Sequence, residues 1–234
     1  MAAADLDRPE TLPPVLEGAD RVFLYARPEG AAGFAAAARA AGVRHLVLLS
    51  SAAVAQKEAR GPIADAHRAV EDAIEDSGIP RTFIRPGMFA TNALWWWREP
   101  VRAGRPVLLP YPLSRTAPVH EKDMAALAVH TLTHPGHEGR AYTVFGPEGL
   151  TLLRQVELIG AALGRELTVE TVSPDEGRAE LARTMPELGV SAVLGAWEAG
   201  VRTDPATSTV IEDVTGRPAR TFARWAEDHA ADFR

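Results

Sequence analysis

The sequence predicts an α/β fold built on a parallel sheet, and two observations support this. First, the stretch HLVLLSSAAV (residues 45–54) is an apolar run of strand length that ends in two serines. A strand that is apolar on both faces is typical of a parallel sheet covered by helices above and below. Second, strand-like and helix-like segments alternate at the spacing of right-handed βαβ units. In such sheets ligands bind beyond the carboxyl ends of the strands, where Ser50 and Ser51 are expected.

Five segments of the first half alternate between strand and helix. In chain order they are expected at residues 20–26, 34–41, 45–54, 63–76 and 81–85. Gly42 is placed to end the first helix in a left-handed conformation. Ser77 and Gly78 end the second helix, and Pro86 stops the strand that follows it.

The second half is less regular. Helices are expected at 88–97, 122–133 and 151–164, strands at 140–145 and 167–172, and two or three further helices up to the carboxyl terminus. We therefore expect a sheet core over residues 1–150, with a pocket-forming insertion at about 87–120. Residues 151–234 are expected to form a small, mostly helical substrate subdomain packed on that core.

Composition excludes several classes of function. The 234 residues carry a net charge of −6, with scattered Lys and Arg, which argues against a nucleic-acid surface. There is no cysteine, so disulfides, thiolate metal sites and cysteine nucleophiles are excluded. We find neither a signal-peptide pattern nor an apolar run long enough to cross a bilayer, so we expect a soluble, cytoplasmic protein without a membrane partner.

A dinucleotide-binding fold usually carries G-x-G-x-x-G between its first strand and first helix, and this sequence does not contain that hexapeptide. The nearest pattern is GAAG, Gly30 to Gly33, which lies between a strand and a helix and could turn backbone amides toward an anion. The alternative is an ordinary connecting loop. Gly30 and Gly33 are therefore weak cofactor candidates, and we expect no cofactor, with NADP as the alternative.

Four stretches resemble the NmrA-like branch of the atypical short-chain dehydrogenase/reductases. They are DLDRPETLPPVLEGADRVFL, AGVRHLVLLSS, HRAVEDAIEDSGIPRTFIRPGMFATNAL and VTGRPARTFARWAEDHAADF. In that family the segment like Asp5 to Asp7 follows the third strand, so the resemblance implies a truncated Rossmann-like sheet without the glycine-loop segment. Three explanations compete: the gene starts here, the chain is trimmed, or the start codon is placed too late.

The resemblance also bears on association. If the chain is complete, the strand containing Val22 to Tyr25 is a sheet edge, and an exposed apolar edge invites pairing. We therefore expect a homodimer that covers this edge or its adjacent face. A monomer in light scattering would contradict this.

The resemblance places His67 where reducing relatives have a lysine, and Ile63 where classical members have a tyrosine. A histidine, with a pKa near 6.5, suits acid/base work at neutral pH. Glu71 follows at i+4 on the same helical face, where it can orient the imidazole or raise its pKa, or make a solvated contact. Ser50 and Ser51 are candidate proton relays or hydrogen-bond donors; the alternative is that they cap the strand end.

Substrate-binding candidates follow the RPG turn, which lines the pocket in the resembling family. They are Met88, Phe89, Asn92, Trp96 and, in the Pro-rich loop, Tyr111. Trp95, Trp96 and Trp97 cannot all face one core, because neighbours on a helix point about 100° apart. His134 and His137 lack a third ligand at a recognisable metal spacing, so we expect a surface turn and no metal site.

Three functions are compatible with these residues. The first is a cofactor-independent acid/base enzyme that dehydrates, isomerises or cyclises an apolar, oxygenated small molecule, such as one of secondary metabolism; it is a lyase, isomerase or cyclase in type. The alternative is an NAD(P)H-dependent oxidoreductase, because a nicotinamide itself carries the hydride. The third is a non-catalytic sensor that binds a regulatory partner. The sequence favours the first.

Overall fold

The computed structural model describes residues 3–55 and 61–234. The chain divides into two compact units. The sheet unit comprises residues 1–87, 124–144 and 210–217, and the helical unit comprises 88–123, 145–209 and 218–234. The expected single boundary at residue 150 is therefore not the observed division, because the chain passes between the units more than once. Residues 56–60, which follow the serine strand, lie outside the described residues.

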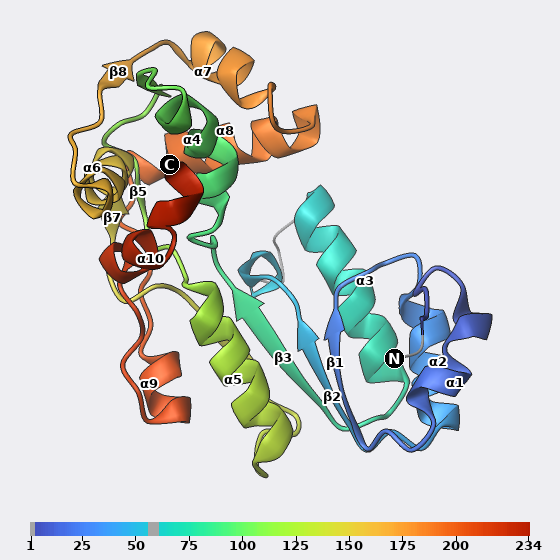
Figure 1. The fold of residues 1–234 in the computed structure, drawn as a ribbon. Coiled ribbons are helices and arrows are strands. Elements are labelled where there is room, and N and C mark those ends of the chain that lie inside the picture. Colours follow the sequence, from blue (N-terminus) through green and yellow to red (C-terminus); the bar gives the residue numbers. More distant parts are fainter. Residues whose placement is uncertain (1–2, 56–60) are drawn as a thin grey trace. The chain divides into compact units, whose positions relative to one another are not determined.

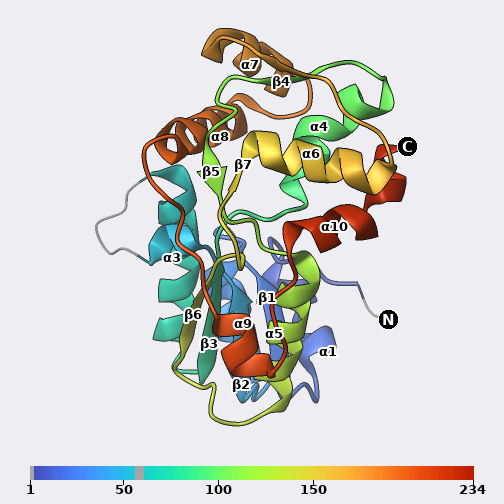
Figure 2. The same ribbon diagram turned by 90° about the vertical axis from the view of Figure 1, so that its left-hand side faces the viewer.

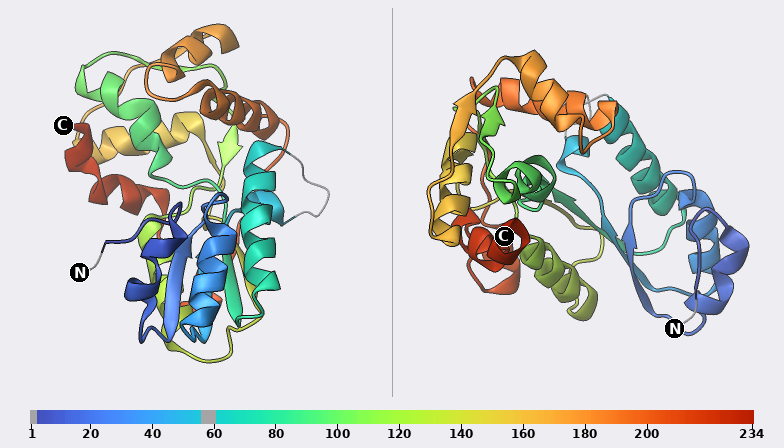
Figure 3. Two further views of the ribbon diagram at one scale, coloured as in Figure 1. Left: turned by 90° about the vertical axis from the view of Figure 1, so that its right-hand side faces the viewer. Right: turned by 45° about the horizontal axis from the view of Figure 1, so that its top comes forward.

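The sheet unit is built on four parallel strands in the order β1-β2-β3-β6 (Figure 1). The strands are β1 (Arg21–Tyr25), β2 (His45–Leu49), β3 (Arg81–Pro86) and β6 (Ala141–Val144). Helices α3 (Pro62–Asp76) and α5 (Glu121–Thr133) cover opposite faces of the sheet (Figures 2 and 3). The predicted α/β class with a parallel sheet and flanking helices is confirmed.

The remaining helices of the sheet unit are short. They are η1 (Pro9–Thr11), α1 (Pro13–Leu16), α2 (Ala31–Ala40), η2 (Ala52–Val54) and α9 (Val210–Thr215). Gly42 ends α2 with a φ of +76°, as predicted, and the Val43 N–H then reaches back to the Ala38 carbonyl. Leu46, Val47 and Leu48 of β2 are fully buried, which explains why this run has no polar face.

The helical unit contains helices and two small sheets. Its helices are α4 (Asn92–Arg102), α6 (Leu152–Leu163), α7 (Pro174–Leu181), α8 (Glu187–Gly200), α10 (Phe222–Asp228) and η3 (Ala230–Phe233). Strand β4 (Val107–Leu109) pairs in parallel with β8 (Val169–Thr171), and β5 (Arg115–Thr116) pairs antiparallel with β7 (Leu150–Thr151). Its core is aromatic and centres on Trp97, Trp197 and Trp225.

Within the described ranges, every helix is too short or too polar to cross a lipid bilayer.

His229 ties the carboxyl-terminal segment to the start of α5 through two carboxylates. Its Nδ1 lies 2.7 Å from Asp232 Oδ2 and its Nε2 lies 2.9 Å from Glu121 Oε1. Burial disfavours the charged ring, but these hydrogen bonds outweigh burial and raise the pKa of His229. The doubly protonated imidazolium is therefore the form that stabilises this corner.

We expect this contribution to stability to depend on pH. Because the folded-state pKa is raised, the contribution is fully present below about pH 6.5, the unfolded pKa, and is lost as the pH rises through the folded pKa. The free energy of unfolding, measured in urea, should fall by about 1–2 kcal/mol more in the wild type than in His229→Gln between acidic and alkaline buffer. An identical fall in both proteins would contradict this role.

Candidate functional site

The carboxyl edge of the parallel sheet carries the two serines predicted from the sequence. The Ser50 N–H donates to the Ile84 carbonyl at 2.7 Å, which extends the pairing of β2 with β3 by one residue. The Ser50 side chain is buried, and its Oγ has no hydrogen-bond partner among the described residues. Ser51 differs, because its Oγ accepts from the Ala53 N–H at 3.2 Å and caps η2. Capping therefore accounts for Ser51, whereas the buried Ser50 hydroxyl is left without a partner among the described residues.

His67 lies at the same edge of the sheet. A crossover helix in a βαβ unit runs antiparallel to its strands, so the first turns of α3 lie at the carboxyl ends of β2 and β3. Figure 1 shows the start of α3 beside η2, and the two elements are in contact. The His67 ring is half-buried, and its Nδ1 is buried with no partner in the described part of the chain. Burial lowers the pKa of His67, although Glu71 acts in the opposite direction.

Glu71 is held by a residue that the sequence analysis did not single out. Arg85 donates from Nε to Oε1 at 2.9 Å and from Nη2 to Oε2 at 2.5 Å, so it binds both carboxylate oxygens. Glu71 is buried, so the expected alternative of a solvated contact is wrong. The signal that could have identified Arg85 is a cation at the end of the otherwise apolar strand TFIRP, because a half-buried charge needs a partner.

Gly30 and Gly33 have a packing role in the structure. A Cβ on Gly30 would lie 2.1 Å from the Leu6 carbonyl oxygen, and a Cβ on Gly33 would lie 2.4 Å from Pro9 Cγ. The two glycines therefore let the amino-terminal segment pass directly over the start of α2. This packing, rather than a phosphate contact, is what the described structure shows for the GAAG stretch.

We expect Gly30→Ala to destabilise the fold by about 1–3 kcal/mol, because the added Cβ meets a backbone carbonyl that cannot rotate away. Gly195→Ala in α8 is the control, since nothing lies within 4 Å of its added Cβ. In an open helical position the same change should stabilise by about 0.5–1 kcal/mol. Urea unfolding followed by circular dichroism would test the pair, and equal effects would contradict the packing role.

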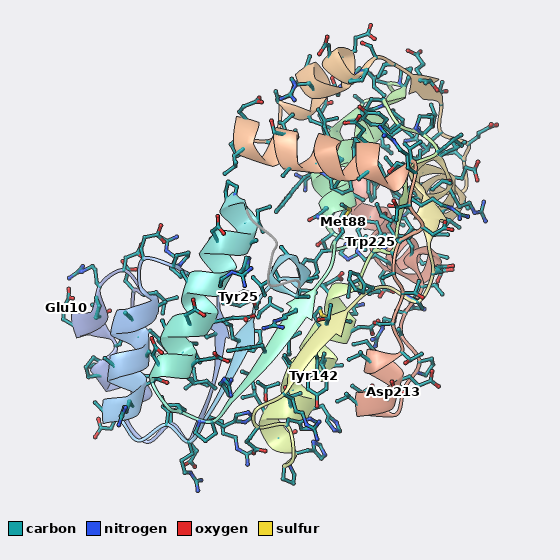
Figure 4. The ribbon with its side chains drawn as sticks, turned by 180° about the vertical axis from the view of Figure 1, so that it is seen from behind. Glu10, Tyr25, Met88, Tyr142, Asp213 and Trp225 are labelled. Atoms are coloured by element: carbon teal, nitrogen blue, oxygen red, sulfur yellow. The ribbon has the colours of Figure 1, made fainter. Side chains whose placement is uncertain are left out.

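The predicted substrate-binding residues belong to the helical unit. Met88, labelled in Figure 4, precedes Phe89 at the start of the helical unit. Both residues lie beside Val119, whose N–H donates to the Met88 carbonyl at 2.8 Å. Asn92 is half-buried at the first position of α4. Tyr111 is partly buried, and its carbonyl accepts from the Ser114 N–H at 3.0 Å. Their role in binding substrate stays a prediction.

The three consecutive tryptophans divide between core and solvent. Trp96 and Trp97 are both buried, and Trp96 meets Trp197 edge-on with ring centroids 5.1 Å apart. Trp95 is 60% exposed instead. The expectation that the three cannot share one core is met, but the residue that points outward is Trp95. Trp96 is a core residue whose indole N–H lacks a described partner.

His134 and His137 belong to a cluster of three histidines at the end of α5. The rings of His130 and His134 stack at 4.0 Å between centroids, and His137 lies edge-on at 5.3 Å from His130. Across residues 3–55 and 61–234, no group of three or more His, Cys, Asp or Glu side chains is arranged to hold a metal ion.

The sequence and the fold both point to one family. A family model described as NAD(P)H-binding matches residues 1–135. The chain belongs to this NAD(P)H-binding, NmrA-like family. The resemblance that the sequence showed to the atypical short-chain dehydrogenase/reductases is thereby confirmed.

Two curated relatives cover most of the chain. The (4-alkanoyl-5-oxo-2,5-dihydrofuran-3-yl)methyl phosphate reductase of Streptomyces griseus is 41% identical over 224 residues, which are 93% of this chain and 78% of the relative. The NAD(P)H azoreductase of Xenophilus azovorans is 32% identical over 240 residues, 99% and 83% of the two chains. Both relatives are enzymes of the oxidoreductase type.

Solved structures share the fold. The NADPH-dependent quinone oxidoreductase of Escherichia coli, in complex with NADPH, superposes with a TM-score of 0.80 at 24% identity, covering 97% of this chain and 82% of its own. The triphenylmethane reductase of Citrobacter sp., in complex with NADP(H), gives a TM-score of 0.79 at 20% identity, with the same coverage. These similarities confirm a Rossmann-like architecture.

The comparisons overturn two predictions. A protein without a cofactor is contradicted by membership of an NAD(P)H-binding family. The cofactor-independent lyase, isomerase or cyclase is contradicted by relatives that are reductases. Both predictions rested on a missing glycine hexapeptide and on side chains capable of proton transfer. Hydride transfer does not depend on such side chains, because the cofactor itself carries that chemistry.

The residues at the sheet edge fit a nicotinamide cofactor. Its carboxamide and ribose hydroxyls need hydrogen-bond partners, and the edge offers the Ser50 Oγ and the His67 Nδ1, both without a partner in the described residues. The carboxyl edge of a parallel sheet is also where such ligands bind in open α/β folds. These two side chains are therefore the groups that would hold the reactive end of the cofactor.

Proposed function

We propose that the protein is an NAD(P)H-dependent reductase of a small, oxygenated organic molecule. The observation that carries the proposal is the pair of unpartnered polar atoms, Ser50 Oγ and His67 Nδ1, at the carboxyl sheet edge of a chain in an NAD(P)H-binding family. The reductase relatives from Streptomyces griseus and Xenophilus azovorans support the same reaction class. Their named substrates, an oxo-dihydrofuran and azo compounds, suggest a double bond polarised by oxygen or nitrogen.

In this proposal His67 provides the proton and Ser50 orients the ligand. A bound nicotinamide supplies a hydride. The reduced double bond also needs one proton, and His67 is the group at the edge whose ring nitrogen can hold it and release it. Ser50 donates a hydrogen bond that fixes the orientation of the ligand. The buried surroundings of both side chains strengthen these contacts, because an interaction is stronger where water is excluded.

Calorimetric titration of the full chain with NADPH and NADH tests the first half of the proposal, and we expect dissociation constants in the micromolar range. Cofactor consumption with a quinone, an azo dye and an unsaturated lactone tests the second half. Ser50→Ala should weaken cofactor binding by roughly 5–30-fold, the effect of one lost hydrogen bond of about 1–2 kcal/mol. No binding at millimolar cofactor would overturn the proposal.

The control for Ser50→Ala is Ser208→Ala. Ser208 is partly buried, and its hydroxyl is already occupied by the backbone of Phe145: it accepts from the N–H and donates to the carbonyl, each at 3.0 Å. It belongs to the helical unit and has no place in the proposed site. Equal losses of cofactor affinity in the two variants would show that the Ser50 effect is general destabilisation.

A further inference from the structure

Arg85 and Glu71 form a buried ion pair one helical turn from His67. Glu71 follows His67 at i+4 on α3, so the two side chains share one face of the helix. Both oxygens of Glu71 are taken by the guanidinium of Arg85, at 2.9 and 2.5 Å. The Glu71 side chain is only 7% exposed, so water does not compete for it. The carboxylate is thus turned to the strand and not to the histidine.

We propose that Arg85 is a positioning residue of the site: by holding both oxygens of Glu71, it withholds this carboxylate from His67 and leaves the His67 Nδ1 free for a ligand. The inference rests on the proposed function, because it assigns a purpose to the free nitrogen. A bidentate guanidinium–carboxylate pair is suited to this task, because its planar geometry fixes the carboxylate in one orientation.

Arg85 and Arg81 both lie against the ring of Phe83 on β3. The Arg85 guanidinium carbon lies 5.7 Å from the centroid of the Phe83 ring, and Arg81 lies over the same ring at 5.3 Å. Arg81 in turn pairs with Glu75, one turn further along α3. The face of α3 is therefore joined to β3 by two ion pairs in succession, Glu75 with Arg81 and Glu71 with Arg85. His67 is the next position on this face, and no described strand side chain pairs with it.

The charged groups near His67 come from a small number of elements. On α3 the charged residues on the face of His67 are Glu71 and Glu75, while Asp65, Arg68 and Asp72 belong to the same helix; on β3 they are Arg81 and Arg85. The element η2, which also packs on α3, contributes only alanine and valine. From α2, Arg39 reaches the carbonyl of Ser77 at the opposite end of α3. Burial is the larger influence on the pKa of His67 and lowers it, and the charge of Glu71 opposes that lowering.

This arrangement has a chemical consequence. A carboxylate released from Arg85 could accept a hydrogen bond from the imidazolium and favour the charged ring. The ring would then be a weaker acid and its free nitrogen would be occupied. Withholding Glu71 leaves the pKa of His67 lowered by burial, so the protonated ring stays a stronger acid that gives up its proton more readily.

The test is a titration of the His67 ring by NMR in the full chain without cofactor, with the resonance assigned from His67→Gln. In Arg85→Gln the pKa of His67 should rise by about 1 unit or more, since an opposite charge at close range typically shifts a pKa by 1–3 units. Adding Glu71→Gln should abolish the rise, because the carboxylate that causes it is gone. An unchanged pKa in Arg85→Gln, or a rise that persists in the double variant, would overturn the inference.

Arg85→Lys is a second test variant in case Arg85→Gln does not fold. Lysine keeps the positive charge but cannot bind both carboxylate oxygens of Glu71. It should raise the pKa of His67 by a smaller amount, and no rise would again overturn the inference. The acid limb of the pH profile of reduction should move with the measured pKa, which a purely structural role would not cause. Because the titration needs no cofactor, the positioning role can fail while cofactor binding succeeds, and the reverse is also distinguishable.

Discussion

Replacing His67 with glutamine is expected to lower kcat for reduction about 10²-fold or more, the contribution of one positioned acid/base group. Glutamine keeps a polar side chain that can donate a hydrogen bond, but it cannot deliver a proton. The Kd for NADPH should therefore change far less than kcat. Stopped-flow measurement of cofactor oxidation, with substrate in excess, separates the two effects.

The pH dependence gives this prediction a second readout. The protonated ring is the acid, and burial lowers its pKa, so kcat of the wild type should rise as the pH falls through that lowered pKa. His67→Gln should lack this rise. The control is His130→Gln on α5, where the ring stacks on His134 and has no place in the proposed site. If both variants lose activity equally, or if His67→Gln keeps the wild-type profile, His67 is not the proton donor.

Local signals account for the success of the fold prediction. The strand at His45 to Leu49 is apolar on both faces, and the helix at Pro62–Asp76 is ended by Ser77 and Gly78, so each element carries its own pattern and stop. The left-handed glycine at position 42 is also a local requirement, because a side chain there would be strained. Information of this kind is present within a few residues of sequence.

The partners of the site residues are not local information. His67 and Glu71 could be placed on one helical face from their spacing, but the cation that controls Glu71 comes from a strand fourteen positions later in the chain. Trp95 and Trp96 are neighbours in sequence, and only the packing of α4 decides that Trp96 is buried against Trp197. The glycines at 30 and 33 resembled a phosphate loop, whereas the structure shows backbone and Pro9 packed against them.

The cofactor illustrates a different limit. Side chains that can transfer protons, such as His67, are visible directly in the sequence. Reasoning from side chains alone therefore favoured acid/base chemistry. A cofactor that donates hydride is recognised in a sequence by the backbone loop that binds it, and this sequence has no G-x-G-x-x-G. Family membership, which draws on the pattern over residues 1–135 as a whole, corrected the interpretation.

Truncation of Trp225 is expected to have the largest effect on stability of any single change in the helical unit. Its side chain, labelled in Figure 4, is fully buried. The distances between ring centroids are 5.0 Å to Phe222, 4.7 Å to His229 and 6.2 Å to Phe233. Trp225→Ala removes the ring that these aromatic contacts share and leaves a cavity that rigid neighbours cannot fill. We expect a loss of about 3–5 kcal/mol in the free energy of unfolding.

The matched control is Trp95→Ala, which removes the same side chain from an exposed position on α4 of the same unit. An exposed truncation should change stability by no more than about 0.5 kcal/mol. Trp225→Phe should fall between the two, because the smaller ring retains part of the packing. Urea unfolding of the three variants measures the series. Equal losses for Trp225→Ala and Trp95→Ala would mean that the core of the helical unit does not depend on the α10 aromatic cluster, and the packing argument would then be wrong.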